Sequence, residues 1–219
     1  MQSKPCYHSQ LDLLRSEISK LEGTSRSLEA KSVPTGCLAL DKTLPQRGFR
    51  AGTLVEWLTS GDGTGAVTLA LLAAKNACRG GGVLVVLDCQ REFYPPAAVP
   101  LGIELPHLIV VQPANPADHH WALDQSLRCP AVGAVLAWPE KLDSRTFRRL
   151  QLAAEEGGSL GLLVRPAEVR KEPSWADVRL LVEPLPAASP PARKRRLRIV
   201  LLRCRGGIDN RELETEIDV

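Results

Sequence analysis

The sequence predicts an α/β fold with an open, mostly parallel central sheet that is flanked by helices on both faces. Apolar runs of strand length alternate with helical patterns along most of the chain, and this alternation is typical of parallel sheets built from β-α-β units. The runs carry few charges, as expected for strands that are covered on both faces. With 219 residues and 44% hydrophobic content, the chain can bury a substantial core in one main domain.

The N-terminal region is predicted to be separate from this core. Residues 9–22 show helical spacing of apolar side chains, so we expect a short amphipathic helix there. Its apolar face would consist of Leu11, Leu14, Ile18 and Leu21. The polar stretch at residues 23–34 looks like a linker. We therefore divide the chain into an N-terminal helix and linker, residues 1–28, and a core domain, residues 29–219.

The core is expected to begin with a short helix at residues 37–41 and to continue as alternating strands and helices. The expected buried strands are residues 52–57, 82–88, 107–112, 132–138, 160–164 and 178–182. The helices between them are expected at residues 65–78, 116–128 and 144–156. No internal repeat is visible.

The end of the chain departs from this alternation. Residues 184–194 include a run rich in Pro and Ala and are predicted to form a flexible loop. Residues 197–202 and 212–219 are expected to pair as antiparallel strands. Apolar and acidic residues alternate in the last strand, so one of its faces should be buried and the other solvated.

The most informative motif is the segment SGDGTGAVTL at residues 60–69. It follows an expected strand and opens an expected helix, which is the context of a phosphate loop with the pattern G-x-x-x-x-G-K-[ST]. Here Ser60 replaces the first glycine, Ala66 the lysine and Val67 the Ser/Thr. Backbone N–H groups could still face an anion at the remaining glycines, which are Gly61, Gly63 and Gly65.

The two substitutions remove the groups on which nucleotide chemistry depends. The lysine would contact the β- and γ-phosphates, and the hydroxyl would hold Mg²⁺. Each would make a charge-assisted contact worth about 1.5–3 kcal/mol. The motif therefore indicates a nucleotide-binding fold that is no longer an ATPase.

Composition excludes several other classes of protein. A net charge of +3 leaves only local patches for nucleic acid. Six dispersed cysteines include no C-x-x-C and no cysteine/histidine cluster at zinc spacing, so we expect reduced thiols, no metal and no cofactor. The start lacks the order of a signal peptide, and no apolar run is long enough to span a bilayer. We therefore expect a cytoplasmic protein.

Several stretches resemble the RecA recombinase core. They are VPTGCLALDKTL…GFRAGTLVEWL…GDGTGAVTLALLAA, GVLVVLDCQREFYPPAAVPLGI…LIVVQPANPADHHWALDQ, WADVRLLV and the final hairpin, and together they cover roughly residues 33–219. A core of this short length with a degenerate phosphate loop is similar to the ImuA family. That family belongs to a damage-inducible bacterial mutasome for translesion synthesis, with ImuB and an error-prone polymerase.

The resemblance implies further losses at the catalytic positions. RecA carries its catalytic glutamate two residues after an aspartate; Asp88 keeps that aspartate, but Gln90 replaces the glutamate. An amide cannot accept the proton of an attacking water. Ala137 stands where RecA has a Mg²⁺-holding aspartate, and Pro166 falls near its phosphate-sensing glutamine. Together with the two losses in the phosphate loop, these changes imply a pseudo-ATPase.

The positions that bind DNA in RecA are also changed. Its two long DNA-contacting loops correspond to short connections at residues 139–144 and 166–174. A basic run remains as a candidate for contacting a phosphate backbone, and it comprises Arg193, Lys194, Arg195, Arg196 and Arg198. The alternative is a solvated strand entrance that is balanced by the acidic last strand.

Two further arginines give the resemblance a mechanism. Arg203 and Arg205 align with the lysines through which a RecA subunit reaches its neighbour's ATP. We expect a non-catalytic adaptor that docks onto RecA and an ImuB-type protein, reaches the error-prone polymerase indirectly, and binds DNA weakly or indirectly. These arginines and the apolar face of the N-terminal helix are the candidate partner surfaces, although that helix could instead fold back on the core. The partners would bring the protein to the nucleoid. The alternatives are a SulA-like inhibitor of a cell-division or repair protein, or a nucleotide-sensing ATPase of the RecA superfamily.

Overall fold

The computed structural model describes residues 31–139, 141–186, 194–207 and 209–218. The predicted N-terminal helix, with Leu11, Leu14, Ile18 and Leu21, lies outside the described residues. The chain divides into two units, Met1–Lys31 and Ser32–Val219. The second unit is described below.

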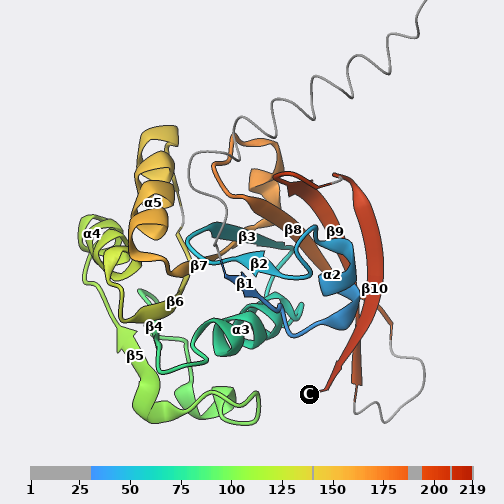
Figure 1. Ribbon diagram of the computed structural model, residues 1–219, viewed down its shortest axis with the longest axis horizontal. Helices are drawn as coiled ribbons and strands as arrows, with labels where there is room; N and C mark the ends of the chain where they lie inside the picture. The colour runs from blue at the N-terminus through green and yellow to red at the C-terminus, as the bar shows by residue number, and fades with distance from the viewer. Residues whose placement is uncertain (1–30, 140, 187–193, 208, 219) are drawn as a thin grey trace, which may run out of the picture. The chain divides into compact units, whose positions relative to one another are not determined.

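The second unit is built on an eight-stranded sheet (Figure 1). In spatial order the strands are β10 (Arg211–Asp218), β9 (Lys194–Cys204), β8 (Val178–Pro184), β3 (Leu54–Thr59), β7 (Leu160–Pro166), β6 (Val132–Ala137), β4 (Val83–Leu87) and β5 (Leu108–Val111). The strands from β8 to β5 are mutually parallel. The strands β9 and β10 are antiparallel. This arrangement confirms the predicted α/β fold with an antiparallel pair at the C-terminus.

Helices cover both faces of the sheet (Figure 1). Helix α3 (Ala66–Ala77) packs on one face, and α4 (Pro116–Arg128) and α5 (Ser144–Gly157) pack on the other. The side of α3 also includes α2 (Leu38–Thr43) and a two-stranded sheet of β1 (Ser32–Val33) and β2 (Phe49–Arg50). Each predicted helix of this unit is present, with its ends shifted by at most two residues.

Strand β3 shows how the two layers share the core. Because successive side chains of a strand point to opposite faces, Val55 and Trp57 pack in the cluster under α3. Leu54 joins the cluster under α4 and α5, and Leu58 belongs to a smaller cluster on that same face. Trp57 is fully buried and meets Phe49 edge-on, with the ring centroids 5.8 Å apart. The sheet is therefore buried on both faces.

The sequence missed the shortest elements, which span too few residues to show a period. They are β1, β2 and the 3₁₀ turns η1 (Pro95–Ala98), η2 (Leu105–His107) and η3 (Ala167–Lys171). Strand β3 starts two residues later than expected, because Gly52 (φ 74°) belongs to the preceding turn, and it continues to Thr59. The predicted loop 184–194 is strand at both ends, since Pro184 pairs with β9 and Lys194 with β10. The rest of that loop lies outside the described residues.

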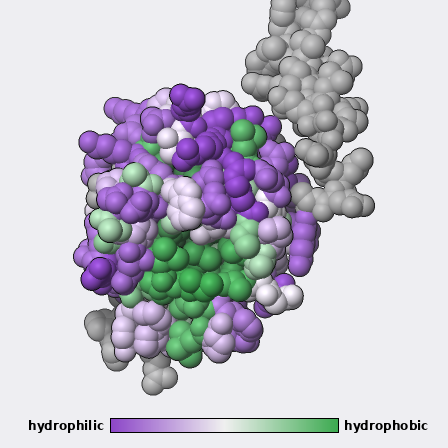
Figure 2. Space-filling model, turned by 90° about the vertical axis from the view of Figure 1, so that its left-hand side faces the viewer, coloured by the Kyte–Doolittle hydropathy of each residue, from purple (hydrophilic) through white to green (hydrophobic). Residues whose placement is uncertain are grey.

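The two edges of the sheet differ in chemistry. The β10 edge exposes Glu212, Glu214 and Glu216, and charges of this kind discourage pairing with another strand. The β5 edge is uncharged, and Ile109 on it is 51% exposed. Figure 2 faces the side with α4, α5 and β5 and shows an apolar area below a mainly hydrophilic one. Within the described ranges, no helix is long and apolar enough to cross a membrane.

Candidate functional site

The phosphate loop joins the end of β3 to the start of α3, on the side of the sheet where the C-terminal ends of the parallel strands lie. Its turn depends on glycine. Gly63 (φ 66°) and Gly65 (φ 90°) adopt left-handed backbone conformations that other residues rarely enter. A Cβ atom on Gly65 would also lie 2.7 Å from Cδ1 of Leu197 on β9. The C-terminal hairpin therefore packs directly on the loop.

Side chains of the protein form hydrogen bonds with backbone groups of the loop at Gly61 and Gly63. The Thr59 hydroxyl donates to the carbonyl of Gly61 (2.7 Å), and the Gly61 amide donates back to that hydroxyl (3.3 Å). The Thr64 hydroxyl contacts the Thr59 hydroxyl and lies 3.3 Å from the Gly61 carbonyl. From β9, Arg195 Nη1 donates to the carbonyl of Gly63 (2.8 Å). Residues of β3, β9 and the loop itself therefore contact the loop backbone at Gly61 and Gly63.

The two substituted positions begin α3. Ala66 is 1% exposed and packs in the core, and Val67 packs against the same cluster. Neither side chain can contact a phosphate oxygen or Mg²⁺. Groups that could still face an anion include the backbone N–H groups at the start of α3 and the guanidinium of Arg195.

A cavity of about 550 Å³ lies over the loop and brings several predicted positions together. Gln90, Pro166 and Arg195 line it, together with all of the loop residues. Ala137 does not line it and is fully buried at the end of β6. The next residue, Trp138, forms part of the wall. The cavity therefore contains neither a carboxylate at the position of Gln90 nor one at the end of β6.

Asp88 shapes the neighbouring segment. Its carboxylate accepts hydrogen bonds from the backbone amides of Glu92 (3.2 Å) and Phe93 (2.9 Å), which closes the turn that carries the exposed Gln90.

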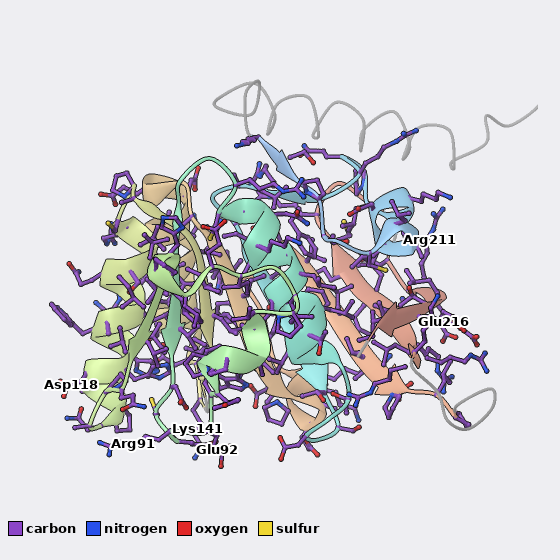
Figure 3. All side chains as sticks on the ribbon, turned by 90° about the horizontal axis from the view of Figure 1, so that it is seen from below. Arg91, Glu92, Asp118, Lys141, Arg211 and Glu216 are labelled. Atoms are coloured by element: carbon purple, nitrogen blue, oxygen red, sulfur yellow. The ribbon has the colours of Figure 1, made fainter. Side chains whose placement is uncertain are left out.

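A second cavity of about 790 Å³ lies beside this turn, between α3 and the start of α4. Figure 3 shows charged side chains along the same side of the molecule, which include Arg91, Glu92, Asp118 and Lys141.

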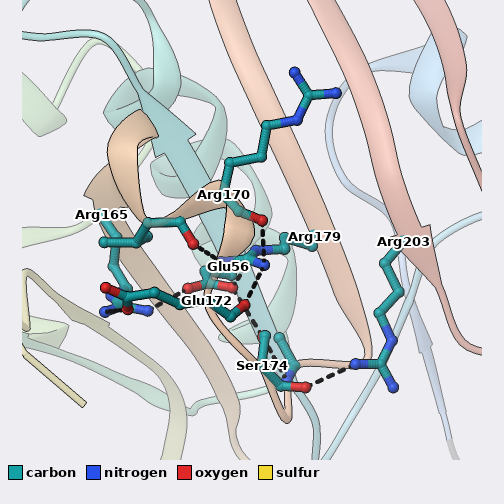
Figure 4. Close-up of polar contacts among 9 residues, drawn as sticks. Glu56, Arg165, Arg170, Glu172, Ser174, Arg179 and Arg203 are labelled. Carbon is teal, nitrogen blue, oxygen red and sulfur yellow. Dashed lines mark hydrogen bonds and ion pairs between the residues drawn. The ribbon is translucent and has the colours of Figure 1, made fainter. Parts of the chain in front are cut away.

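A buried ion network that sequence reasoning missed lies beneath η3 (Figure 4). The side chains of Glu56 and Arg165 are both 0% exposed, and Arg165 Nη1 lies 2.7 Å from Glu56 Oε1. The other oxygen of Glu56 lies 2.7 Å from Arg179 Nε and accepts a hydrogen bond from Ser174 Oγ (2.9 Å). Arg165 also pairs with Glu172 (3.1 Å). A charged residue within a mainly apolar strand was the sequence signal that could have indicated this network, and Glu56, Arg165 and Arg179 each provide one.

The same network fixes the connection between β7 and β8. Arg179 donates to backbone carbonyls at Val169, Arg170 and Glu172. Arg203 Nη1 on β9 donates to the carbonyl of Ser174 (2.7 Å). The connection between β7 and β8 is therefore pinned to the sheet.

The predicted partner-binding arginines lie at the opposite end of the strands from the phosphate loop, near the N-terminal ends of β8 and β3. Cys204 at the end of β9 pairs with Val178 at the start of β8, which runs parallel to β3. Arg203 and Arg205 flank this end, and both are exposed. Two predicted sites therefore stay apart, because strand direction places them at opposite ends.

A buried carboxylate helps to hold this basic end. Asp177 lies 3.2 Å from Arg50 and 3.8 Å from Arg205. Burial raises the pKa of the Asp177 carboxyl, while Arg50, Arg205 and Arg203 act in the opposite direction. The side chain of Arg205 is 52% exposed, so it keeps access to solvent.

The basic run lies along the start of β9, except that Arg193 falls outside the described residues. Arg196 pairs with Glu214 on β10 (2.9 Å), and Arg198 pairs with Glu183 on β8 (3.2 Å). Arg195 turns to the phosphate loop, as described above, and Lys194 is exposed. Two of the basic charges are therefore balanced by acidic residues of adjacent strands. In the described part of the chain, no group of three or more His, Cys, Asp or Glu residues could hold a metal ion.

Comparison with known proteins agrees with this geometry. The family model of the RecA N-terminal domain matches residues 12–136. Protein RecA of Rhodopirellula baltica is 30% identical over 114 residues, which are 52% of this chain and 30% of the relative. Protein RecA of Acidothermus cellulolyticus is 34% identical over 104 residues, 48% of this chain and 30% of the relative. Protein RecA of Mesorhizobium japonicum is 28% identical over 152 residues, 69% of this chain and 40% of the relative.

These alignments span well under half the length of the relatives. The family match nevertheless covers more than half of this chain. It includes the phosphate loop, β3, β4 and β5, and all of β6 except its last residue. The chain belongs to the RecA N-terminal domain family.

Proposed function

We propose that this chain is a non-catalytic, RecA-related adaptor in DNA repair, of the kind found in the ImuA family. One observation carries the proposal. The phosphate loop lacks the lysine and the hydroxyl that would hold a nucleotide and Mg²⁺, and side chains of Thr59, Thr64 and Arg195 contact its carbonyls. At the opposite end of the strands, Arg203 and Arg205 are exposed. The chain retains the scaffold and one possible contact surface but lacks the catalytic groups.

The geometry supports docking on one side only. A RecA subunit offers ATP at one end and basic residues at the other, and this chain keeps only the basic end, at Arg203 and Arg205. It would sit on the exposed ATP face of a terminal RecA subunit and offer no liganded face to the next. Such a heterologous contact terminates an otherwise open polymer. Arginine can make bidentate phosphate contacts, so its replacement of lysine need not weaken the interaction.

This placement would link a RecA filament end to an ImuB-type protein and, through it, to an error-prone polymerase. The contact with DNA would be indirect or weak, because Arg196 and Arg198 are already paired with carboxylates. The adaptor would then act in translesion synthesis after DNA damage.

The test is co-sedimentation of the protein with preformed RecA filaments. The double variant Arg203→Glu/Arg205→Glu should lose binding, because it reverses the charge that faces ATP phosphates. Circular dichroism should show that the fold is kept. The matched control is Arg91→Glu/Lys141→Glu, which makes the same change of charge at exposed positions elsewhere. If the first variant binds as well as the parent, the docking model is wrong.

A nucleotide-sensing protein is the second candidate, and the cavity over the loop with Arg195 in its wall favours it. Titration calorimetry with Mg·ATP separates the two functions. The adaptor predicts no heat of binding. A micromolar dissociation constant that Arg195→Ala abolishes would favour the sensor. A pull-down that recovers a cell-division protein instead of RecA would point to a SulA-like inhibitor.

A further inference from the structure

The exposed face of α5 carries a patterned stripe of charges around one apolar residue. Leu152 is 44% exposed. Arg148 and Arg149 precede it by four and three residues, and Glu155 and Glu156 follow it by three and four. All four charged side chains are exposed. The stripe is therefore basic before Leu152 and acidic after it.

The stability of α5 itself does not explain this order. A helix favours acidic residues near its N-terminus and basic residues near its C-terminus, and the stripe has the reverse arrangement. The first turn of α5 contains no acidic residue, and the last turn contains no basic one. The oppositely charged residues of the stripe lie six to eight positions apart, which is beyond the three- and four-residue spacing at which side chains pair within a helix. The order of the charges is therefore not explained by the helix alone.

Contacts within the protein use these charges only in part. Arg149 Nε lies 3.4 Å from Asp124 on α4, and the side chain of Arg149 remains 53% exposed. Glu156 pairs with Arg128 of α4, and its side chain remains 65% exposed. Arg148 Nη1 donates to Oε1 of Gln151 on the same helix, and its guanidinium lies 4.9 Å from the ring centroid of Trp175. The side chains of Arg149 and Glu156 therefore stay accessible to a partner from outside.

The stripe is complementary to itself in the antiparallel direction. A helix turns by about 100° per residue, which places Arg148 and Glu155 on one side of Leu152 and Arg149 and Glu156 on the other. A twofold axis at Leu152 would bring Arg148 of one copy opposite Glu155 of the second. Arg149 would face Glu156 in the same way, and each pair would occur twice. The two Leu152 side chains would meet at the centre.

From this pattern we propose that the chain forms a twofold-symmetric homodimer in which the α5 helices of two copies pack antiparallel around Leu152. An interface of this kind uses the same patch on both subunits, so its residues must complement one another. The stripe meets that requirement in charge and in position. Trp175 (42% exposed) lies against Arg148 of the stripe and supplies further apolar contact area. Tryptophan and arginine are also the residue types that contribute most to binding at protein interfaces.

A charge-reversal pair tests the proposal by sedimentation velocity over a range of concentrations. The parent should show a concentration-dependent dimer that weakens as salt is added. Arg148→Glu/Arg149→Glu gives an all-acidic stripe and Glu155→Arg/Glu156→Arg an all-basic one, so each alone should repel its own copy. We expect the dimer dissociation constant of each variant to rise by at least about tenfold. An equimolar mixture of the two variants should restore the dimer, because every acidic side chain then faces a basic one.

The mixture protects the test from a folding artefact, since an unfolded variant would not recover a defined dimer. Leu152→Glu adds a single change at an exposed position and should also dissociate the dimer. The control Glu212→Arg/Glu216→Arg changes two exposed charges on β10 and should leave association unchanged. The proposal is overturned if the parent stays monomeric, if the variants associate as the parent does, or if the folded variants do not associate when mixed.

Discussion

Removal of the Glu56 carboxylate should destabilise this protein more than any surface substitution. The side chain is fully buried and lies within hydrogen-bonding distance of Arg165, Arg179 and Ser174. Glu56→Ala would leave the Arg165 guanidinium in the core with only the half-exposed Glu172 as counterion. Loss of one partner from a buried ion pair costs about 3–5 kcal/mol, because the remaining charge is no longer compensated. That loss is large beside a typical unfolding free energy of about 5–15 kcal/mol.

Urea denaturation followed by circular dichroism measures the effect. With a slope of about 2 kcal/mol/M, the midpoint should fall by roughly 1.5–2.5 M. Glu56→Gln keeps the shape and should give a smaller but clear loss. Glu214→Ala is the matched control, since Glu214 (61% exposed) and its partner Arg196 (36% exposed) form a pair at the surface, and an exposed pair contributes about 0–1 kcal/mol. A loss below about 1 kcal/mol for Glu56→Ala would refute the reasoning, because the arginines would then not depend on this carboxylate.

Three further outcomes are expected. Ala66→Lys should not create ATP turnover, because the catalytic base and the Mg²⁺-holding carboxylate stay absent, and a coupled ATPase assay that detects turnover would contradict this. Arg196→Ala/Arg198→Ala should change weak DNA binding and its salt slope very little, since both charges are already paired; a flattened slope in fluorescence anisotropy would show that they contact phosphates. Burial raises the pKa of the Cys78 and Cys204 thiols from 9.0 to about 11, so alkylation at pH 8, read by mass spectrometry, should be about a hundredfold slower than for an ordinary thiol. Because these pKa values are raised in the folded state, the associated stability is present below about pH 9 and is lost as the pH rises through about 11; a flat stability profile over that range would contradict the assignment.

The sequence by itself determined the fold class. The alternation of apolar runs with helical patterns reports which residues are buried, and burial follows a period of two in strands and 3.6 in helices. The parallel strands and the main helices of the described unit could be predicted for this reason. The boundaries could not, since turn residues such as Gly52 depend on local backbone geometry.

The sequence also determined which chemistry the phosphate loop lacks. A missing functional group is a property of the residue itself, so Ala66 and Val67 exclude a lysine and a hydroxyl at these positions in any packing. The retained turn was visible as well, because glycine is the residue that readily adopts a left-handed backbone.

Only the tertiary structure decided how the charged residues are used. Arg195 bonds the carbonyl of Gly63 across 132 residues of chain, and Glu56 meets Arg165 across 109 residues. Strand order and direction create such contacts, and they also place Arg203 at the end of the strands opposite to the phosphate loop. Local periodicity shows that a segment is buried but carries no information about its neighbours, so the partners of a buried charge become known only when the sheet is assembled.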